Sequence, residues 1–541
     1  MTPPKPTPKS GRARSQERQL EQAVALLDAG HLEPACELLR ALLAVNPQYP
    51  EAHYQLGIAL GKSGQVQAAR ASFVQAVGVD KDFAKGWYRL GNASHAAGEL
   101  AGALQCYERA AVLSPATAVF HFNCAVVLRQ LNRCEDARLS YQRVIALDST
   151  HADAHYNLGN LLRDAHRSAE AVPCYERALA LRPLHAESHL NLAAALGECG
   201  RLAEVAAVYT RALLLLPGCS QARINQALHQ LLLGDFAAGW AGYEARLNHP
   251  QGPANREFEA PPWRGDGPLA NRTLLVYAEQ GLGDFLQFYR YVPALLARGA
   301  RVILEVPTAL VPLLPAPAPG LSVLPVGATR PPFDGHCPLL SLPLAFGTRL
   351  SSIPAALPYL SPPPALAAQW RARLGVRRQW RVGLVWFGNP QHANDRNRSI
   401  ALELLEPLLA LPVEFHSLHD QVRPADLPMF ARHPEICRHE SNLPDLAHTA
   451  ALIDTLDLVI SVDTSVAHLA GALAKPLWVL LPYVPDFRWL LTRTDSPWYP
   501  TARLFRQPTQ GDWPRVVAAV GRALLEMTQA TKHPPHSGGL A

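Results

Sequence analysis

Acidic, hydroxyl and imidazole side chains gather where an apolar run ends and a helix is expected to begin. The stretch SVDTSVAHLAGAL, residues 461–473, contains Asp463, Thr464 and Ser465, with His468 one turn further on. These side chains could simply cap the helix, because their oxygens accept the free backbone N–H groups of its first turn. The same N–H groups and the helix dipole attract phosphate, so the stretch is also a candidate anion site.

A second polar cluster, FGNPQHANDRNRS at residues 387–399, follows the apolar run VGLVW. Its polar and charged members are Asn389, His392, Asn394, Asp395, Arg396, Arg398 and Ser399. A loop this polar could be merely solvated. Two arginines at the carboxyl end of an expected parallel strand nevertheless favour diphosphate binding, because planar guanidinium groups present paired donors to phosphate oxygens.

A glycine-rich turn, EQGLGD at residues 279–284, follows the first expected strand of the second half of the chain. Gly281 and Gly283 would let the backbone approach a ligand closely, and Gln280 lies beside them. Asp284 begins the next helix and could be only a cap. The turn does not match GxGxxG, and no Gly-Lys-Ser/Thr follows it, which disfavours a dinucleotide site or a P-loop.

Charged and aromatic residues also mix in PYVPDFRWLLTRTDSPWYP, residues 482–500. They are Asp486, Arg488, Trp489, Trp498 and Tyr499. The two tryptophans could stack on a base or a sugar, or they could fill the face between two domains.

Strands and helices alternate around these clusters from residue 272 onward. The expected strands are TLLVYA, RVILEV, RVGLVWFG, VEFHSLH, LDLVISVD and PLWVLLP. This alternation predicts parallel sheets covered on both faces. The Pro-rich stretch 357–370 is a plausible linker between two α/β blocks, and ligands of such sheets bind in the cleft at the carboxyl ends of the strands.

The first half of the chain repeats every 34 residues. The turn positions are Gly30, Gly64, Gly98, Asn132, His166, Gly200 and Gly234. A large residue follows nine positions after each turn, from Leu39 to Tyr243, and a small or modest one follows after five positions. This pattern resembles tetratricopeptide repeats, whose helix pairs stack into an α-solenoid. It implies a concave face suited to an extended polypeptide, although a rigid spacer would show the same pattern.

The span 272–525 resembles the glycosyltransferases related to bacterial lipopolysaccharide heptosyltransferases, glycosyltransferase family 9. The motifs that carry the resemblance are GLGDFLQFYRYVPAL near the start and DTSVAHLAGAL near the end. The resemblance implies an α/β GT-B fold of two Rossmann-like domains and a reaction in which an acceptor hydroxyl displaces a nucleoside diphosphate from a sugar. A repeat array ahead of such domains is also similar to protein O-GlcNAc transferases, whose catalytic motifs do not obviously match here.

Carried over residue by residue, the resemblance implies that Asp284 is the catalytic base. It implies that the donor diphosphate meets the residues Asp463, Thr464, Ser465 and His468, with Arg396 or Arg398 where the family has a lysine. Ser465 stands where that family usually has glycine, and His448 stands where similar proteins carry an acid.

Further cleft candidates accompany these residues. They are Gln280, Gly281, Gly283, Asn389, His392, Asp395 and Trp489. From residue 272 onward, no Asp-x-Asp motif or His/Cys cluster suggests a metal, so we expect transfer without a metal and without a cofactor other than the nucleotide-sugar co-substrate.

We therefore expect five segments along the chain. They are a disordered tail (1–15), about seven repeats (16–250), a first Rossmann-like lobe (272–360), a nucleotide-sugar-binding lobe (371–525) and a second disordered tail (526–541). The expected function is transfer of a sugar to a hydroxyl of a polypeptide or glycan that the repeats engage. The alternative is a non-catalytic protein–protein interaction scaffold with a degenerate transferase domain; a nucleotide-sugar epimerase shares the fold class, but no such motif is apparent.

Composition narrows the partners and the compartment. The net charge of +5 in 541 residues is too mild to indicate a nucleic acid or an anionic membrane. The nine cysteines are scattered without a CxxC pair, which favours reduced thiols. No apolar run approaches the ~18 residues of a transmembrane helix, and the N-terminus lacks the apolar core of a signal peptide. We expect a cytoplasmic protein.

Overall fold

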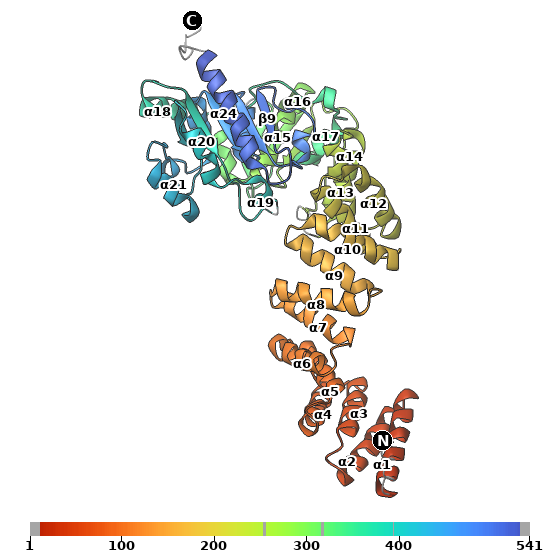
Figure 1. Ribbon diagram of the computed structural model, residues 1–541. Helices are drawn as coiled ribbons and strands as arrows, with labels where there is room; N and C mark the ends of the chain where they lie inside the picture. The colour runs from red at the N-terminus through yellow and green to blue at the C-terminus, as the bar shows by residue number, and fades with distance from the viewer. Residues whose placement is uncertain (1–10, 251, 253–255, 315–318, 393, 531–541) are drawn as a thin grey trace. The chain divides into compact units, whose positions relative to one another are not determined.

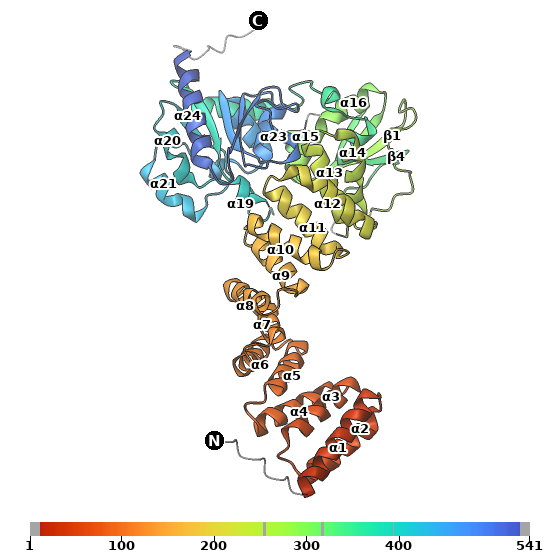
Figure 2. The ribbon, with the colours of Figure 1, turned by 45° about the vertical axis from the view of Figure 1, so that its right-hand side comes forward.

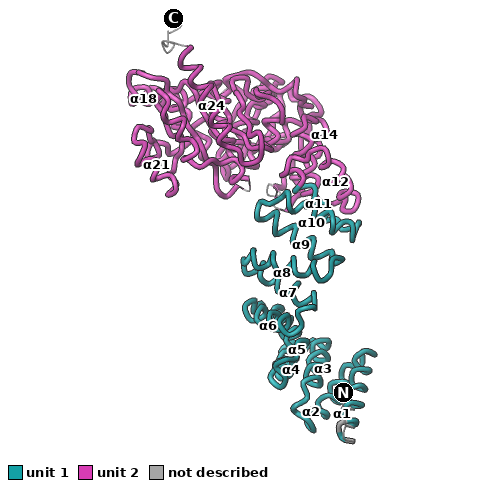
Figure 3. The backbone as a smooth tube through the Cα atoms, in the orientation of Figure 1, with its two compact units in different colours: residues 1–195 teal, residues 196–541 magenta. Residues whose placement is uncertain are grey.

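The computed structural model describes residues 11–250, 252, 256–314, 319–392 and 394–530. The chain forms two compact units, residues 1–195 and 196–541, and the boundary falls inside helix α11 (Figure 3). The first unit holds most of the helical repeats. The second unit holds the last repeats and two α/β lobes (Figure 1).

Paired helices of 13 or 14 residues follow the first helix of the array. Their bounds are α1 Gly11–Asp28, α2 Leu32–Val45, α3 Pro50–Lys62, α4 Val66–Val79, α5 Ala84–Ala96, α6 Leu100–Leu113, α7 Ala118–Gln130, α8 Cys134–Leu147, α9 Ala152–Asp164, α10 Ser168–Leu181 and α11 Ala186–Glu198.

Left-handed turn residues set the period of the array. Gly30, Gly64 and Gly98 have φ angles of 81°, 80° and 77°, and Asn132 and His166 take the same place at 59° and 60°. Glycine adopts this conformation without steric cost, and asparagine and histidine adopt it more readily than most residues. The turns predicted at a spacing of 34 residues are confirmed at these positions.

Glycines in the first helix of a pair admit an aromatic ring from the second helix. A Cβ on Gly91 would lie 2.7 Å from the ring of Tyr107, and one on Gly159 would lie 2.8 Å from the ring of Tyr175. The Tyr107 hydroxyl donates a 2.8 Å hydrogen bond to Asn92, so the ring is fixed at both ends. The large residue predicted nine positions after each turn therefore packs against the preceding helix.

The end of the array continues into the second unit. Its elements are α12 Leu202–Leu215, α13 Ser220–Leu232, α14 Phe236–Tyr243 and the 3-10 turn η1 Glu244–Asn248. The buried ring of Trp240 lies edge-on to Phe288 of the first lobe at 5.8 Å between centroids. It also meets Phe487 and Trp498 of the second lobe at 5.6 and 6.4 Å. The last helix pair is thus docked on both lobes by one aromatic cluster.

The first lobe is a four-stranded parallel sheet in the order β3-β2-β1-β4. Its strands are β1 Thr273–Tyr277, β2 Arg301–Val306, β3 Leu321–Pro325 and β4 Gly335–Pro338. Its helical segments are α15 Leu282–Phe288, η2 Tyr289–Tyr291, α16 Val292–Ala297, η3 Thr308–Leu313, η4 Leu339–Ser341, α17 Leu342–Ala345 and η5 Leu350–Ser352.

The second lobe is a five-stranded parallel sheet in the order β6-β5-β7-β8-β9. Its strands are β5 Arg381–Val385, β6 Glu414–Ser417, β7 Leu458–Val462, β8 Leu477–Leu481 and β9 Ala502–Arg506. Its helical segments are α18 Pro364–Leu374, α19 Asp395–Arg398, η6 Leu402–Leu405, α20 Glu406–Leu409, η7 Pro424–Asp426, α21 Leu427–Arg432, η8 Glu440–Asn442, α22 Leu446–Asp454, α23 Ser465–Ala472, η9 Phe487–Trp489 and α24 Trp513–Ala530. Each of the six strands expected from the sequence is present, and both sheets are parallel as predicted.

Three predicted irregular stretches are partly helical. Helix α18 begins at Pro364, inside the predicted linker, because proline is tolerated in the first turn of a helix. Helix α1 begins at Gly11 and α24 runs to Ala530, so the disorder predicted for 11–15 and 526–530 is wrong. Both stretches are terminal turns of 18-residue helices, and each contains good helix formers such as arginine, alanine, glutamate or methionine. The rest of the two predicted tails lies outside the described residues.

A search of the described helices for a membrane span finds none with the necessary length and apolar character.

The close contact between Gly91 and Tyr107 predicts a large cost for a side chain at this position. Gly91→Ala should destabilise the array by about 1–3 kcal/mol, because a buried ring would have to move. Urea denaturation followed by far-UV circular dichroism measures the change. Gly78→Ala is the matched control: Gly78 is also helical with open space around it, so alanine should stabilise by about 0.5–1 kcal/mol. Equal effects of the two changes would contradict this packing.

Candidate active site

The glycine-rich turn 279–284 and the candidate anion site 461–473 meet where helix α15 of the first lobe packs against helix α23 of the second lobe (Figure 2). Each helix starts directly after a central strand, α15 after β1 and α23 after β7. A Cβ on Gly283 would lie 3.0 Å from the His468 ring and 3.5 Å from the Cα of Ser465. Gly283 therefore permits the two helix starts to touch.

Asp284 lies in the first turn of α15 and is bound from both lobes. Its carboxylate accepts a 3.0 Å hydrogen bond from the Gly281 amide, which caps the helix. It also forms an ion pair with Arg488 of the second lobe. About 20% of the Asp284 side chain stays exposed, so solvent can still reach it. Gly281 is the N-cap residue, so the N-cap role predicted for Asp284 is wrong. Asp284 is the third residue of α15, and the ion pair across the lobes is added to its hydrogen bond with the N-cap amide.

Arg488 is the buried cation of this contact. Its guanidinium pairs with Asp284, lies 2.8 Å from Asp486, and donates to the Gln287 side chain. Burial alone would favour a neutral guanidine, but the carboxylates of Asp486, Asp284 and Asp463 raise the pKa of Arg488. The group is therefore a permanent positive charge between the lobes.

Two carboxylates near Arg488, those of Asp284 and Asp463, hold protons more tightly than free ones do. Burial raises the pKa of Asp284 above its ordinary value, against the lowering effect of Arg488. Burial also raises the pKa of Asp463, and the nearby Asp486 adds to this shift. Desolvation thus increases the proton affinity of Asp284 and Asp463, and the positive charge of Arg488 limits this increase.

The start of α23 leaves backbone donors open. Thr464 is the N-cap residue, yet its side chain makes no capping hydrogen bond and lies 3.2 Å from the Ser461 hydroxyl instead. Within the described part of the chain, nothing accepts a hydrogen bond from the amides of Ser465 and Val466. The side-chain capping interpretation therefore fails at Thr464, and two amides at the positive end of the helix remain available to an anion.

His468 is a packed side chain. Its Nδ1 atom is 2.9 Å from the Tyr499 hydroxyl, and its ring stacks on Trp489 at 5.6 Å between centroids. Its Nε2 atom is 3.8 Å from the Asp463 carboxylate. Burial lowers the pKa of His468 far below its ordinary value, so the ring is neutral at pH 7. The fixed ring packs beside Asp463 and helps to hold the first turn of α23 in place.

The tryptophans of 482–500 fill the contact between the lobes. Trp489 and Trp498 are fully buried. Arg290 of the first lobe donates a 2.6 Å hydrogen bond to the Trp498 carbonyl and lies over the Trp498 ring. Of the two predicted roles for these rings, filling the face between domains is the one that their burial fits.

The polar loop 387–399 reaches α23 through one of its two arginines. Arg398 donates a 2.9 Å hydrogen bond to the Asp463 carbonyl and pairs with Asp395 at 3.2 Å. A Cβ on Gly388 would lie 2.6 Å from this guanidinium, so glycine makes room for it. Arg396 is exposed, and it makes no hydrogen bond or ion pair with the described residues.

Two further loop candidates make local contacts. The Asn389 side chain accepts a hydrogen bond from the Gln391 amide at 2.9 Å, and His392 accepts one from the Asn394 amide at 3.2 Å. Partial loss of hydration lowers the pKa of His392 below its ordinary value, and the positive charge of Arg398 lowers it further. The structure therefore brings Arg398 to the start of α23 and leaves Asn389, His392 and Arg396 toward solvent.

His448 lies apart from these residues, at the first turn of α22. Its ring is 2.8 Å from the Asp445 carboxylate, and it lines a pocket of about 220 Å³ with Trp370 and Arg373. His448, the residue that differs from related sequences, is thus paired with Asp445, the N-cap residue of α22.

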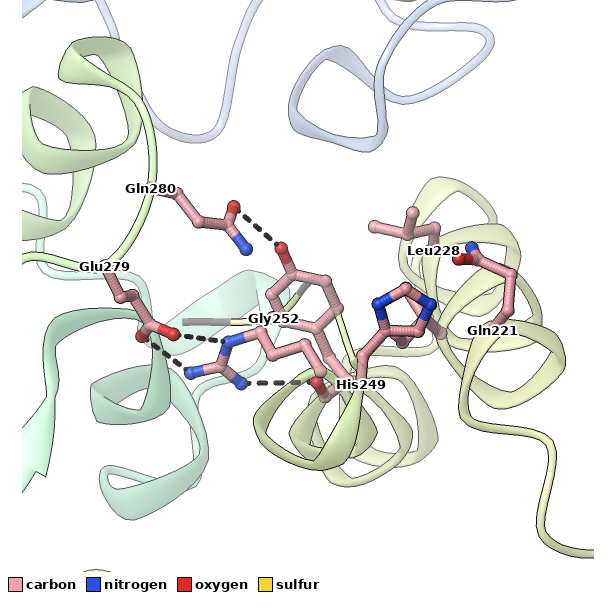
Figure 4. A pocket seen from close by; sticks show the side chains of 9 residues that line it. Gln221, Leu228, His249, Gly252, Glu279 and Gln280 are labelled. Atoms are coloured by element: carbon pink, nitrogen blue, oxygen red, sulfur yellow. Dashed lines mark hydrogen bonds and ion pairs between the residues drawn. The ribbon is translucent and has the colours of Figure 1, made fainter. Parts of the chain in front are cut away.

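A pocket of about 260 Å³ adjoins the glycine-rich turn (Figure 4). The Tyr243 hydroxyl, at the end of the array, donates a 3.1 Å hydrogen bond to the Gln280 side chain. Beneath it, Arg246 pairs with the fully buried carboxylate of Glu279 at 2.8 Å. Gln221 of α13 lines the opposite wall. The wall is therefore built jointly by the last repeats and the first lobe.

Several residues of the site escaped the sequence interpretation. In the sequence, Tyr243 matches the large packing position of the seventh repeat, which predicts a structural role. Arg246 follows it in a segment without a recognisable motif. Arg290 and Gln287 lie in an aromatic helix that predicts core packing. The one available signal was Arg488, a charged residue between two aromatic residues in DFRW.

The fold and the site together define a helical-repeat protein with a two-lobed α/β region, in which a helix start with two open amides lies beside a partly buried acid of the other lobe. Comparison with protein families agrees. Residues 20–60, 54–118, 125–165 and 152–184 match tetratricopeptide repeat models, and residues 443–488 match glycosyltransferase family 9 (heptosyltransferase). The chain thus carries tetratricopeptide repeats in its N-terminal part and a segment near its C-terminus that matches glycosyltransferase family 9. That segment contains Asp463, His468 and Arg488.

Protein FlbA of Caulobacter vibrioides is 27% identical over 328 residues, which cover 55% of this chain and 53% of FlbA. The chain spans about half the length of the curated relative that it matches.

Solved repeat structures also align with the chain. PilF of Pseudomonas aeruginosa is 19% identical, with 40% of this chain and 99% of that one covered at a TM-score of 0.36. MamA of Desulfovibrio magneticus is 20% identical, with 31% and 96% covered at a TM-score of 0.30. YrrB, described as a repeat protein with an unusual peptide-binding site, is 18% identical, with 35% and 96% covered at a TM-score of 0.33.

The buried position of Arg488 predicts that its charge is essential for stability. Arg488→Gln should destabilise the C-terminal unit by about 1–3 kcal/mol, because Asp284 and Asp486, which are 20% and 32% exposed, would lose their cation partner in a partly desolvated site. Urea denaturation followed by tryptophan fluorescence measures this. Arg493→Gln removes an arginine from an exposed pair with Asp495 and should change stability little. A similar small effect of both changes would show that the Arg488 pairs contribute little.

Proposed function

We propose that this protein transfers a sugar from a nucleotide-diphosphate sugar to an acceptor hydroxyl. One observation carries the proposal: Asp284 of the first lobe and the open amides of Ser465 and Val466 in the second lobe face the same contact between the lobes. A base and an anion site are the two groups that such a displacement needs. The family 9 match over 443–488 supports the same reaction.

The Asp284 carboxylate accepts the proton of the acceptor hydroxyl as its oxygen bonds to the anomeric carbon. The bond from that carbon to the diphosphate oxygen breaks, and the diphosphate leaves with its added negative charge. The amides of Ser465 and Val466, with Arg398 behind them, stabilise this charge as fixed donors. The positive end of α23 and the arginine act in this scheme in place of a metal ion.

The ion pair with Arg488 holds the base in place before substrate binds. Arg488 orients the Asp284 carboxylate, while burial keeps its pKa above the ordinary value and so increases its proton affinity. A carboxylate near its unperturbed pKa of ~3.9 would be a weak base at neutral pH. Desolvation is the factor that makes it stronger here.

The acceptor approaches through the pocket of Figure 4 in this proposal. Tyr243 connects that pocket to the base: burial and the charge of Asp284 raise the pKa of Tyr243 to about 12, so its hydroxyl stays a neutral hydrogen-bond donor. The repeats hold the polypeptide or glycan that carries the acceptor hydroxyl, since stacked helix pairs present a concave surface to extended partners.

The alternative function is a non-catalytic interaction scaffold. The observation that favours it is the engagement of Asp284 by Arg488, which a bound substrate would have to share. The two functions differ in one measurement. Incubation with a panel of nucleotide sugars releases free nucleoside diphosphate if the protein is a transferase, and a scaffold releases none.

Replacing the base without losing its shape tests the reaction. Asp284→Asn should abolish acceptor-dependent transfer and leave donor binding within about twofold, because an amide keeps the hydrogen bond from Gly281 but accepts no proton. Calorimetry with the nucleoside diphosphate and a release assay measure the two effects. In the unaltered enzyme, activity should fall with decreasing pH through a pKa above ~3.9, since only the charged carboxylate is a base. Transfer by Asp284→Asn at the original rate would remove Asp284 from the mechanism.

The two arginines of the polar loop can be separated by affinity. Arg398→Gln should weaken nucleoside diphosphate binding by about 10-fold or more, which corresponds to the loss of one charge-assisted hydrogen bond. Arg396→Gln is the matched change on the exposed side of the same loop and should have a smaller effect. Titration calorimetry measures both. A larger loss of affinity in Arg396→Gln than in Arg398→Gln would instead indicate that Arg396 binds the diphosphate.

A further inference from the structure

A second cluster of chemically active side chains lies at the far end of the second lobe. Glu414 and His416 belong to the edge strand β6, and Cys437 lies on a short extended segment beside it. One ligand atom of each residue lies within 4.8 Å of the other two. Glu414 is the first residue of β6, so the cluster is at the amino-terminal end of the parallel strands, whereas the cleft lies at the carboxyl-terminal ends.

Backbone pairing turns the three side chains to the same face. Residues two apart in a strand share a face, which places Glu414 beside His416. The Cys437 amide donates to the Phe415 carbonyl at 2.8 Å, and the Ser417 amide donates to the Cys437 carbonyl at 2.9 Å. Cys437 is therefore held directly opposite His416 in a parallel pair. The cluster is fixed by main-chain hydrogen bonds and does not depend on flexible loops.

The distances match those of a tetrahedral zinc site. The His416 Nε2 atom is 3.4 Å from a Glu414 carboxylate oxygen, and the Cys437 Sγ atom is 3.8 Å from the same oxygen. Zinc bonds of about 2.0–2.2 Å to nitrogen and oxygen and 2.3 Å to sulfur, at tetrahedral angles, require separations of about 3.4 and 3.6 Å. Both separations from the Glu414 oxygen are close to these values, and the nitrogen and the sulfur lie within 4.8 Å of each other.

The His416 ring points an unpartnered nitrogen into the cluster. The side chain is fully buried, and its Nε2 atom makes no hydrogen bond, although an unsatisfied buried polar atom is costly. Its Nδ1 atom is 3.0 Å from His439 Nε2. A proton on Nδ1, donated to His439, leaves the Nε2 lone pair facing a carboxylate oxygen. In that tautomer the two lone pairs at 3.4 Å repel each other, and a metal ion between them would remove the repulsion.

Neighbouring groups complete the environment of a metal site. His439 fixes the orientation of the ligating ring, as outer partners of metal-bound histidines do. Arg381 donates to the other Glu414 oxygen at 3.4 Å, which leaves the first oxygen for the cation. About 31% of the Glu414 side chain is exposed, so solvent can supply a fourth ligand.

We propose that Glu414, His416 and Cys437 bind one zinc-class divalent ion, with water as the fourth ligand. A thiolate and an imidazole favour Zn²⁺ over Mg²⁺ or Ca²⁺. The thiol proton passes to solvent when the sulfur–metal bond forms. The ion joins the extended segment around Cys437 to the edge of the sheet. The site is remote from the strand ends that form the cleft and does not depend on the proposed transfer reaction.

Cobalt titration of the metal-free full-length protein tests the site directly. Co²⁺ should bind one to one and give a near-ultraviolet thiolate-to-metal charge-transfer band together with visible bands of tetrahedral cobalt, and Zn²⁺ should displace it. Cys437→Ser should abolish the charge-transfer band. Competition with a chromophoric chelator should show a loss of Zn²⁺ affinity of about 100-fold or more for Cys437→Ser and Glu414→Gln, since even outer-shell changes cost 10- to 100-fold.

Cys134→Ser is the matched control, because Cys134 is an exposed cysteine of the repeat unit outside the cluster. It should keep the band and the affinity. Zn²⁺ should raise the melting temperature of the unaltered protein and of Cys134→Ser, but not that of Cys437→Ser. Absence of the band in the unaltered protein, or its persistence in Cys437→Ser, would overturn the proposal. If Cys437→Ser does not fold, unchanged Zn²⁺ affinity in Glu414→Gln would overturn it equally.

Discussion

The buried charge of Arg488 is the constraint on which the C-terminal unit depends. A guanidinium removed from water is tolerated only with carboxylate partners at hydrogen-bonding distance. One partner, Asp486, is local, but Asp284 belongs to the other lobe. The requirement for charge compensation therefore holds α15 against the second lobe, which it meets at η9 through Arg488 and at α23 through direct packing. Gly283, which has no side chain to separate them, makes the contact sterically possible.

The same contact gives the site its proposed chemistry. Asp284 is desolvated because the lobes meet over it, and it is kept in position because Arg488 holds it. The start of α23 carries its positive helix end to the same place, with backbone amides that lack partners among the described residues. Stability and reactivity here come from one arrangement, since the charge that compensates Arg488 is also the proposed base.

The end of the repeat array is adapted to this contact. Tyr243 occupies the large position of a repeat, yet its hydroxyl bonds Gln280 beside the proposed base. Trp240, one helical turn earlier, closes an aromatic cluster with residues of both lobes. The last repeat therefore differs from the others in that it packs against both lobes, although it keeps the 34-residue spacing. The structural consequence is a pocket shared by repeat and lobe.

The sequence alone determined the local and periodic features. The 34-residue spacing followed from turn residues such as Gly64 and Gly98, whose positive φ is a property of the residue type, and strand β7 followed from its apolar run. The polar clusters at strand ends were also visible, because in parallel sheets strand ends carry ligand-binding residues.

Tertiary structure decided which of these clusters meet and which side chains remain available. Arg488 finds Asp284 about 200 residues away, and Trp489 proves to be core rather than a stacking surface. Cys437 comes to face His416 only through an added strand pairing. Such partnerships depend on packing between elements far apart in the chain, and no local pattern of residue types records them. Burial and charge compensation, the two factors that set the chemistry of Asp284, arise only in the folded molecule.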